Sequence, residues 1–150
     1  MITPWYITGY CESAALFTYS RSGGTYTIFF SIKHNEGNNQ LLEDIQIFFG
    51  YIGTVYTHKP SSVFRVNKIE ELKRITDHFD KYPLQDKKKL ASYGIWRQMV
   101  EHKLENYRDV EYAKLKNLAD RLSSLNSQNR ILLRRERERV ALPSRLAHAA

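Results

Sequence analysis

An alternation of helical and hairpin patterns constrains the fold of this chain more than any other feature. Apolar residues recur at helical spacing in some segments, while others read as two short strands joined by a tight turn. Helices are expected at 5–16, 41–49 and 69–79, and hairpins at 17–33 and 53–66. Two hairpins predict a four-stranded antiparallel sheet, and the interspersed helices predict that one sheet face is covered. The expected class is therefore α+β.

The length and composition narrow the class of protein. A chain of 150 residues suits one domain, and 42% apolar residues can build a core while 26% charged residues suit a soluble protein. No apolar run approaches the ~20 residues that a membrane span needs, so we expect no membrane partner. Cys11 is the single cysteine, which excludes a disulfide framework and a cysteine zinc site within the chain. The first ten residues resemble neither a secretory signal nor a transit peptide.

The pattern becomes helical from Asp86 almost to the end of the chain. Tyr93, Trp96 and Val100 lie near one helical face, and a second apolar series runs from Leu115 to Leu125. The polar stretch 123–128 predicts a break, and a final basic helix over 131–142 is expected to end before Pro143. We therefore divide the chain into a domain at 1–105 and a helical extension at 106–150. Both tryptophans, Trp5 and Trp96, are expected in the core.

The net charge of +7 is concentrated near the C-terminus. The last 30 residues hold seven arginines, no lysine and two glutamates, whereas the first 120 hold 16 basic and 14 acidic residues. Arginine forks match phosphate geometry and stack on bases, so this segment favours nucleic acid as its partner. The alternative is a solvated helix whose Glu–Arg pairs lie three or four residues apart.

The strand residues predict that the uncovered sheet face is polar. On the segment 25–33 one parity holds Tyr26, Ile28, Phe30 and Ile32, which is the core face, and the other is polar with one aromatic ring. The polar set, with its extension on the second hairpin, comprises Thr25, Thr27, Phe29, Ser31, Lys33, Thr54, Tyr56, His58, Arg65 and Asn67. Such side chains can contact phosphates, base edges and 2′-hydroxyls. A solvated face of an antiparallel sheet is the alternative.

Several segments together resemble one known family. The run 5–17, WYITGYCESAALF, resembles the first helix of the LAGLIDADG homing endonucleases in the branch that reads W-x-I-T-G-F-x-D-A-E-G-C-F. Further similarity lies, in order, at 41–50, 53–56, 64–66 and 75–84, followed by three lysines at 87–89. The resemblance covers about residues 5–105. It implies an αββαββα fold, in agreement with the order of patterns described above.

The resemblance also implies a mechanism. Members with one signature helix form homodimers through small residues on that helix, and their saddle-shaped sheets grip DNA. An acidic residue near the end of each signature helix binds a divalent metal, which supports hydrolysis of the phosphodiester. Lys87 matches the family's active-site lysine, and His78 falls within a family phrase where we expect a structural role.

This sequence departs from the family at the metal-binding acid. An ungapped match places Glu12 at the first acid of the motif, Ala14 at the metal-binding acid and Ala15 at the closing glycine. Alanine has no oxygen ligand to offer, and Glu12 points elsewhere, about 200° round the helix from Ala14. We therefore predict no catalytic residue, no metal and no cofactor. A one-residue shift of register, or an alanine substituted in an active enzyme, are the alternatives.

The leading hypothesis is a catalytically inactive homing-endonuclease-like protein that binds structured RNA. It would be a component of an organellar, mitochondrial ribosome, contacting rRNA and neighbouring ribosomal proteins, and a homodimer is possible but not required. A metal-dependent homodimeric DNA endonuclease and an intron-splicing maturase are the alternatives. The residues expected to contact nucleic acid are Lys33, Arg65, Lys87, Lys88, Lys89, Arg130, Arg134, Arg135, Arg137, Arg139 and Arg145.

Overall fold

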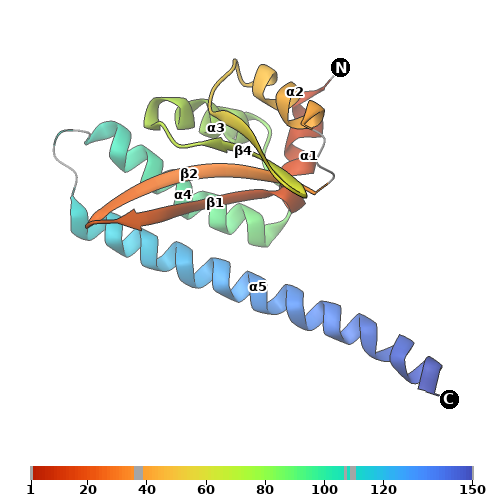
Figure 1. Ribbon diagram of the computed structural model, residues 1–150. Coiled ribbons are helices and arrows are strands. Elements are labelled where there is room, and N and C mark those ends of the chain that lie inside the picture. The colour runs from red at the N-terminus through yellow and green to blue at the C-terminus, as the bar shows by residue number, and fades with distance from the viewer. Residues whose placement is uncertain (1, 36–38, 107, 109–110, 150) are drawn as a thin grey trace.

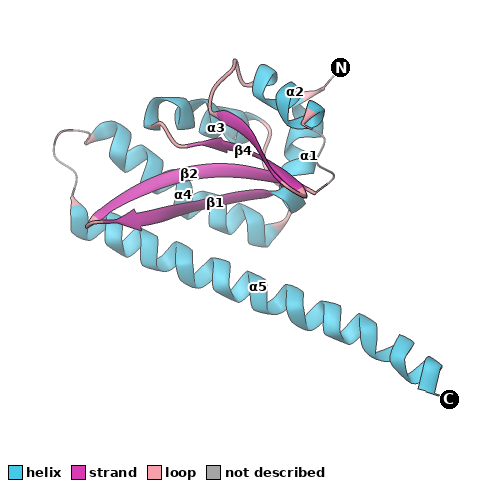
Figure 2. Cartoon of the chain, in the orientation of Figure 1, coloured by secondary structure: helices cyan, strands magenta, loops and turns pink. Residues whose placement is uncertain are grey.

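The computed structural model describes residues 2–35, 39–106, 108 and 111–149, and its elements follow the predicted order. Figure 2 shows the helices and strands, which alternate up to the end of α3. Their bounds are α1 Pro4–Ala14, β1 Ala15–Ser22, β2 Thr25–His34, α2 Gln40–Phe48, β3 Thr54–His58, β4 Ser61–Val66, α3 Ile69–Lys81, α4 Lys87–Glu105 and α5 Tyr112–Ala149. The helix α1 begins as expected, with Pro4 in its first turn and the Thr3 hydroxyl accepting a 3.1 Å bond from the amide of Tyr6.

The four strands form one antiparallel sheet in the order β1-β2-β4-β3. Each hairpin pairs internally, and β4 joins the two hairpins by pairing with β2, so that Ser31 lies opposite Arg65. Arg65 in turn lies opposite Thr54 of β3. The predicted α+β class and four-stranded antiparallel sheet are confirmed.

The core lies between the sheet and the helices. The side chains of Tyr26, Ile28, Phe30 and Ile32 are all buried, as their parity predicted. Figure 1 shows α3 and α4 behind the strands, leaving the other face of the sheet uncovered. Trp96 of α4 is fully buried and its indole Nε1 donates to the carbonyl oxygens of Thr18, at 3.1 Å, and Phe29, at 3.0 Å. This side chain therefore ties α4 to both strands of the first hairpin.

The prediction that Trp5 belongs to the core is wrong. Its side chain is 54% exposed and packs edge-on against the ring of Tyr82, with 5.3 Å between the ring centroids. The buried positions of α1 are Ile7, Thr8 and Cys11, which share one face of the helix, and Trp5 lies off that face. The helix also ends at Ala14, two residues earlier than expected, because Ala15 already pairs with Ile32 in the sheet.

The predicted division of the C-terminal region into two helices is wrong. One helix, α5, runs from Tyr112 to Ala149 through the polar stretch 123–128 and through Pro143. The polar stretch stays helical because Asn126 has tertiary partners: it accepts from Ser92 Oγ at 3.1 Å and donates to the carbonyl of Phe17 at 3.4 Å. Proline removes one helical hydrogen bond, which weakens a helix at that point without obliging it to end.

The two halves of α5 have different surroundings. The first half packs against α4 and along the outer edge of β1, burying Leu115, Leu118, Ala119 and Leu122. The second half leaves the body and ends far from it (Figure 1). The described helices, α5 included, all fall short of the apolar length that crossing a bilayer demands.

Candidate nucleic-acid interface

The uncovered face of the sheet carries the polar residues that the sequence placed there. The register sets Ser31, Arg65 and Thr54 side by side across β2, β4 and β3. Lys33 and Thr54 are exposed, Tyr56 is 42% exposed, and Thr27, Phe29, Ser31 and Arg65 are half-buried within the curve of the sheet. The side chain of His58 lies outside the described part of the structure. We refer to this surface, formed by alternate residues of the four strands, as the open face.

The composition of the strands gives the open face an unbalanced charge. None of the four strands contains Asp or Glu, although the chain has 16 acidic residues. Lys33 and Arg65 lie on this face without an acidic neighbour in their own or adjacent strands. A curved surface with cations, hydroxyls and no carboxylate attracts a polyanion and offers hydrogen bonds to its sugars and bases.

The corner between the end of α1 and the start of α4 is where the family motif would place its metal. Ala14 contributes only a methyl group there. The carbonyl oxygen of Ala15 accepts a 2.6 Å hydrogen bond from Lys89 Nζ, and burial lowers the pKa of Lys89 from its ordinary value. A lysine amine thus lies against the end of the signature helix. This contact was not expected, because the family resemblance had singled out Lys87 and Lys89 was predicted to contact nucleic acid.

Glu12, the other acidic residue of the motif, has a structural role. Its Oε1 accepts from the backbone amides of Gln85 and Asp86, the latter at 3.1 Å, just before α4 begins. Asp86 in turn caps α4 by accepting a 3.0 Å bond from the amide of Lys89. Both carboxylates are therefore used to start α4. No cluster of three His, Cys, Asp or Glu suited to a metal ion occurs among the described residues.

The remaining predicted contact residues fall into two places. Lys87 and Lys88 are exposed in the first turn of α4, beside the corner just described. Arg135 and Arg139 are exposed one turn apart on α5. The side chains of Arg130, Arg134, Arg137 and Arg145 lie outside the described part of the structure, although their backbone belongs to α5. The structure thus separates the sheet residues and lysines, which belong to the body, from the arginines on α5.

His78 belongs to the packing of the body. Its Nε2 lies 3.0 Å from Thr8 Oγ1, and that hydroxyl donates to the carbonyl of Tyr82 at 2.8 Å, linking α1 to α3. Burial lowers the pKa of His78 to about 4, so the ring is neutral at pH 7. These contacts fit the structural role that the sequence predicted.

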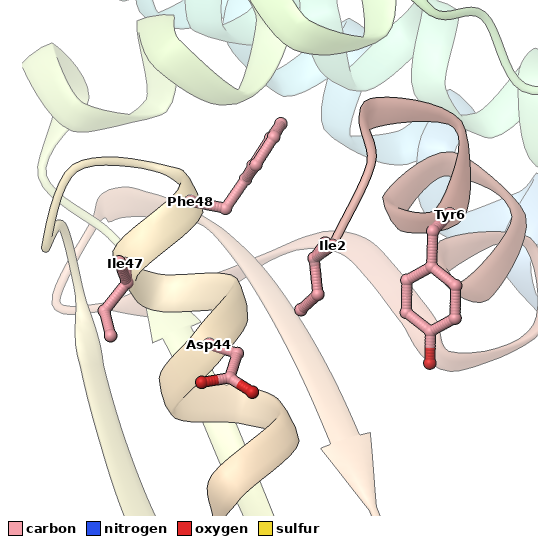
Figure 3. A pocket seen from close by; sticks show the side chains of 5 residues that line it. All are labelled: Ile2, Tyr6, Asp44, Ile47 and Phe48. Atoms are coloured by element: carbon pink, nitrogen blue, oxygen red, sulfur yellow. The ribbon is translucent and has the colours of Figure 1, made fainter.

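A shallow hollow lies between the start of α1 and α2, on the helical side of the molecule. Figure 3 shows the side chains that line it: Ile2, Tyr6, Asp44, Ile47 and Phe48. Its volume is about 620 Å³. The lining is apolar with one carboxylate, which is poor chemistry for a polyanion, so the hollow is not part of the nucleic-acid interface.

Comparison with known proteins agrees with this geometry. Residues 7–100 match the LAGLIDADG endonuclease family. The uncharacterized 50.9 kDa protein in ND4 intron 1 of Podospora anserina is 30% identical over 109 residues, which are 66% of this chain and 24% of that protein. The crystal structure of the LAGLIDADG meganuclease I-AabMI bound to uncleaved DNA superposes with a TM-score of 0.71 and 26% identity, over 79% of this chain and 44% of that one.

A second solved structure gives the same picture. The LAGLIDADG meganuclease I-CpaMI bound to uncleaved DNA matches with a TM-score of 0.69 and 26% identity, over 79% of this chain and 42% of its own. The chain therefore spans less than half of these enzymes and about a quarter of the Podospora protein. The family match covers most of the signature helix, the whole sheet and most of α4. The chain belongs to the LAGLIDADG endonuclease family.

Proposed function

We propose that this protein is a LAGLIDADG domain without nuclease activity that binds structured RNA through its open face and α5. The observation that carries the proposal is Ala14 at the position of the metal-binding acid. Hydrolysis of a phosphodiester by this family's mechanism needs a carboxylate that holds a divalent metal beside the scissile phosphate. The two neighbouring carboxylates, Glu12 and Asp86, are engaged by backbone amides at the start of α4.

The arginines of α5 favour RNA as the partner. Residues 129–150 hold six arginines and two glutamates, on a helix that extends beyond the body (Figure 1). One arginine can donate two hydrogen bonds to a phosphate, and it can also stack on an unpaired base. Folded RNA presents phosphates and unpaired bases close together. A place in a mitochondrial ribosome, with rRNA and ribosomal proteins as neighbours, is the proposal's most specific form.

Two assays test the two halves of this proposal. Incubation of the protein with a plasmid library and Mg²⁺ is expected to leave the DNA uncut, and a site-specific double-strand cut would end the claim of inactivity. Binding to total rRNA fragments is expected to weaken at least tenfold when the chain ends at residue 129. That end point lies beyond Asn126, which bonds to the carbonyl of Phe17 in the body, so we expect the shortened chain to keep its fold. Equal affinity of the two chains would refute the role of α5.

Specific observations favour two other functions. I-AabMI and I-CpaMI are described in complex with DNA and are more than twice as long as the matched region, which favours a DNA-cleaving assembly in which this chain supplies one half. Cleavage only after mixing with a second LAGLIDADG domain would support it. The ND4 intron position of the Podospora relative favours a maturase, for which faster splicing of an intron RNA in the presence of the protein is the test.

A further inference from the structure

At the centre of the open face, two stacked side chains have no role in the function proposed above. The guanidinium carbon of Arg65, on β4, lies 3.8 Å from the centroid of the Phe29 ring, on the adjacent strand β2. A guanidinium at this distance lies directly over the ring and is attracted by its π-electrons. Both side chains are half-buried, so each keeps some surface exposed to solvent.

A comparison with Arg97 shows what is unusual about Arg65. On the helical side of the molecule, Arg97 donates to both oxygens of Asp80 and also pairs with Glu101 at 3.1 Å. The strands around Arg65 contain no carboxylate that could pair with it in this way. Its charge therefore remains available to a ligand, while the Phe29 ring holds the guanidinium plane in position.

The groups next to the pair suit a nucleotide. Ser31 and Thr54 lie opposite Arg65 on the two flanking strands, and each carries a hydroxyl group that can donate to or accept from a base edge or a 2′-hydroxyl. Lys33 is exposed two residues beyond Ser31 on the same face, within reach of an adjacent phosphate. A flat cation, two hydroxyls and an ammonium group thus occupy one small area of the sheet.

We infer that Phe29 and Arg65 form a stacking platform for an unpaired nucleobase of single-stranded or looped RNA. The inference rests on the proposed RNA-binding function and specifies the part of the RNA that the open face recognises. Only an unpaired base can use the platform, because the flat faces of a paired base are covered by its neighbours in the duplex. The platform therefore selects loops, bulges and ends over continuous helices.

The test compares binding of one RNA strand in two forms. Affinity is measured by fluorescence anisotropy with a labelled 16-nucleotide single strand and with the same strand annealed to its complement. Phe29→Leu removes the ring and keeps apolar bulk, and R65K keeps the charge and removes the flat guanidinium. Each is expected to lower single-strand affinity roughly 5- to 100-fold, the range for loss of one stacked base, with duplex affinity changed less than twofold. A 2-aminopurine in the strand is expected to change its fluorescence on binding to the wild type and to change less with Phe29→Leu.

Lys33→Gln is the matched control on the same face. It removes a phosphate contact and is expected to lower both affinities by a similar factor. Unchanged single-strand affinity in both Phe29→Leu and R65K, with melting temperatures like the wild type, would overturn the platform and leave RNA binding standing. Equal losses for the two forms of RNA would overturn it as well, because the face would then bind duplex. If the wild type bound neither form, the proposed function itself would fail.

Discussion

The two halves of α5 belong to one continuous helix but differ in burial and in charge. Residues 112–128 contribute Leu115, Leu118 and Leu122 to the core and hold three basic residues and one acidic residue. Residues 129–150 hold six arginines and two glutamates, and the helix over 129–149 extends past the body. The first half stabilises the domain by burial of apolar surface. The second half is an arginine-rich arm, as we call residues 129–149 of α5.

The packed unit extends further along the chain than the family match does. The sequence match to the family covers residues 7–100, and the packed unit continues to Asn126, which bonds to the carbonyl of Phe17 on the outer edge of β1. An edge strand exposes unpaired backbone groups, and a helix laid along it protects them. The first half of α5 is therefore part of the fold, and its burial anchors the arginine-rich arm at a fixed place on the body.

Ending the chain at different residues tests this division most strongly. A chain that ends at residue 111 loses three buried leucines and the cover of β1, and we expect its free energy of unfolding to fall by roughly 5 kcal/mol or more. A chain that ends at residue 129 is expected to unfold within about 0.5 kcal/mol of the full chain. Urea titration followed by circular dichroism measures both. Equal stability of the two shortened chains would show that α5 is an appendage throughout.

A single substitution tests whether the first half of α5 belongs to the core. Leu122→Ala, at a fully buried position of α5, is expected to lower the free energy of unfolding by about 2–4 kcal/mol through lost burial and the cavity left behind. Leu90→Ala on α4 is the matched control, because its side chain is 42% exposed, and there the loss is expected to stay below about 1 kcal/mol. A loss at Leu122 no greater than at Leu90 would contradict the packing described for α5.

The sequence predicted the local structure better than the tertiary contacts. Alternation along β2 identified both sheet faces, since parity depends only on the residues of one strand. The polar stretch 123–128 was predicted as a break because its composition favours one, and only the contacts of Asn126 with Ser92 and Phe17 show why it is helical. At the candidate site, the motif located Ala14, but the reach of Lys89 to Ala15 depends on how α4 meets α1.

A fall in pH is expected to lower the stability of the body through His78. The folded-state pKa of His78 is about 4 against 6.5 for an ordinary histidine, so the unfolded chain binds this proton more readily. The contribution of His78 is therefore fully present above pH 6.5 and is lost as the pH falls from 6.5 towards 4, by about 2 kcal/mol. His78→Gln is expected to flatten the stability profile in this window. The arginines of the arginine-rich arm keep their charge in this window, because arginine stays protonated.

Substitutions in the arginine-rich arm are expected to have the smallest effect on stability and a clear effect on binding. Arg135 and Arg139 are exposed and one turn apart, so replacing both with Gln is expected to change the free energy of unfolding by less than about 0.5 kcal/mol. If both contact phosphates, the slope of log affinity against log salt for single-stranded RNA falls by about 1.4, at roughly 0.7 per contact.

Lys73→Gln, a lysine on α3 paired with Asp77 at 2.9 Å, is the control and is expected to leave the slope unchanged. A slope that fell half as much with Lys73→Gln, in proportion to the one charge removed against two, would mean that RNA responds to total charge alone, and the arginine-rich arm would lose its separate role. A slope that fell only with the arginines would place the RNA backbone along the second half of α5, distant from the core that its first half completes.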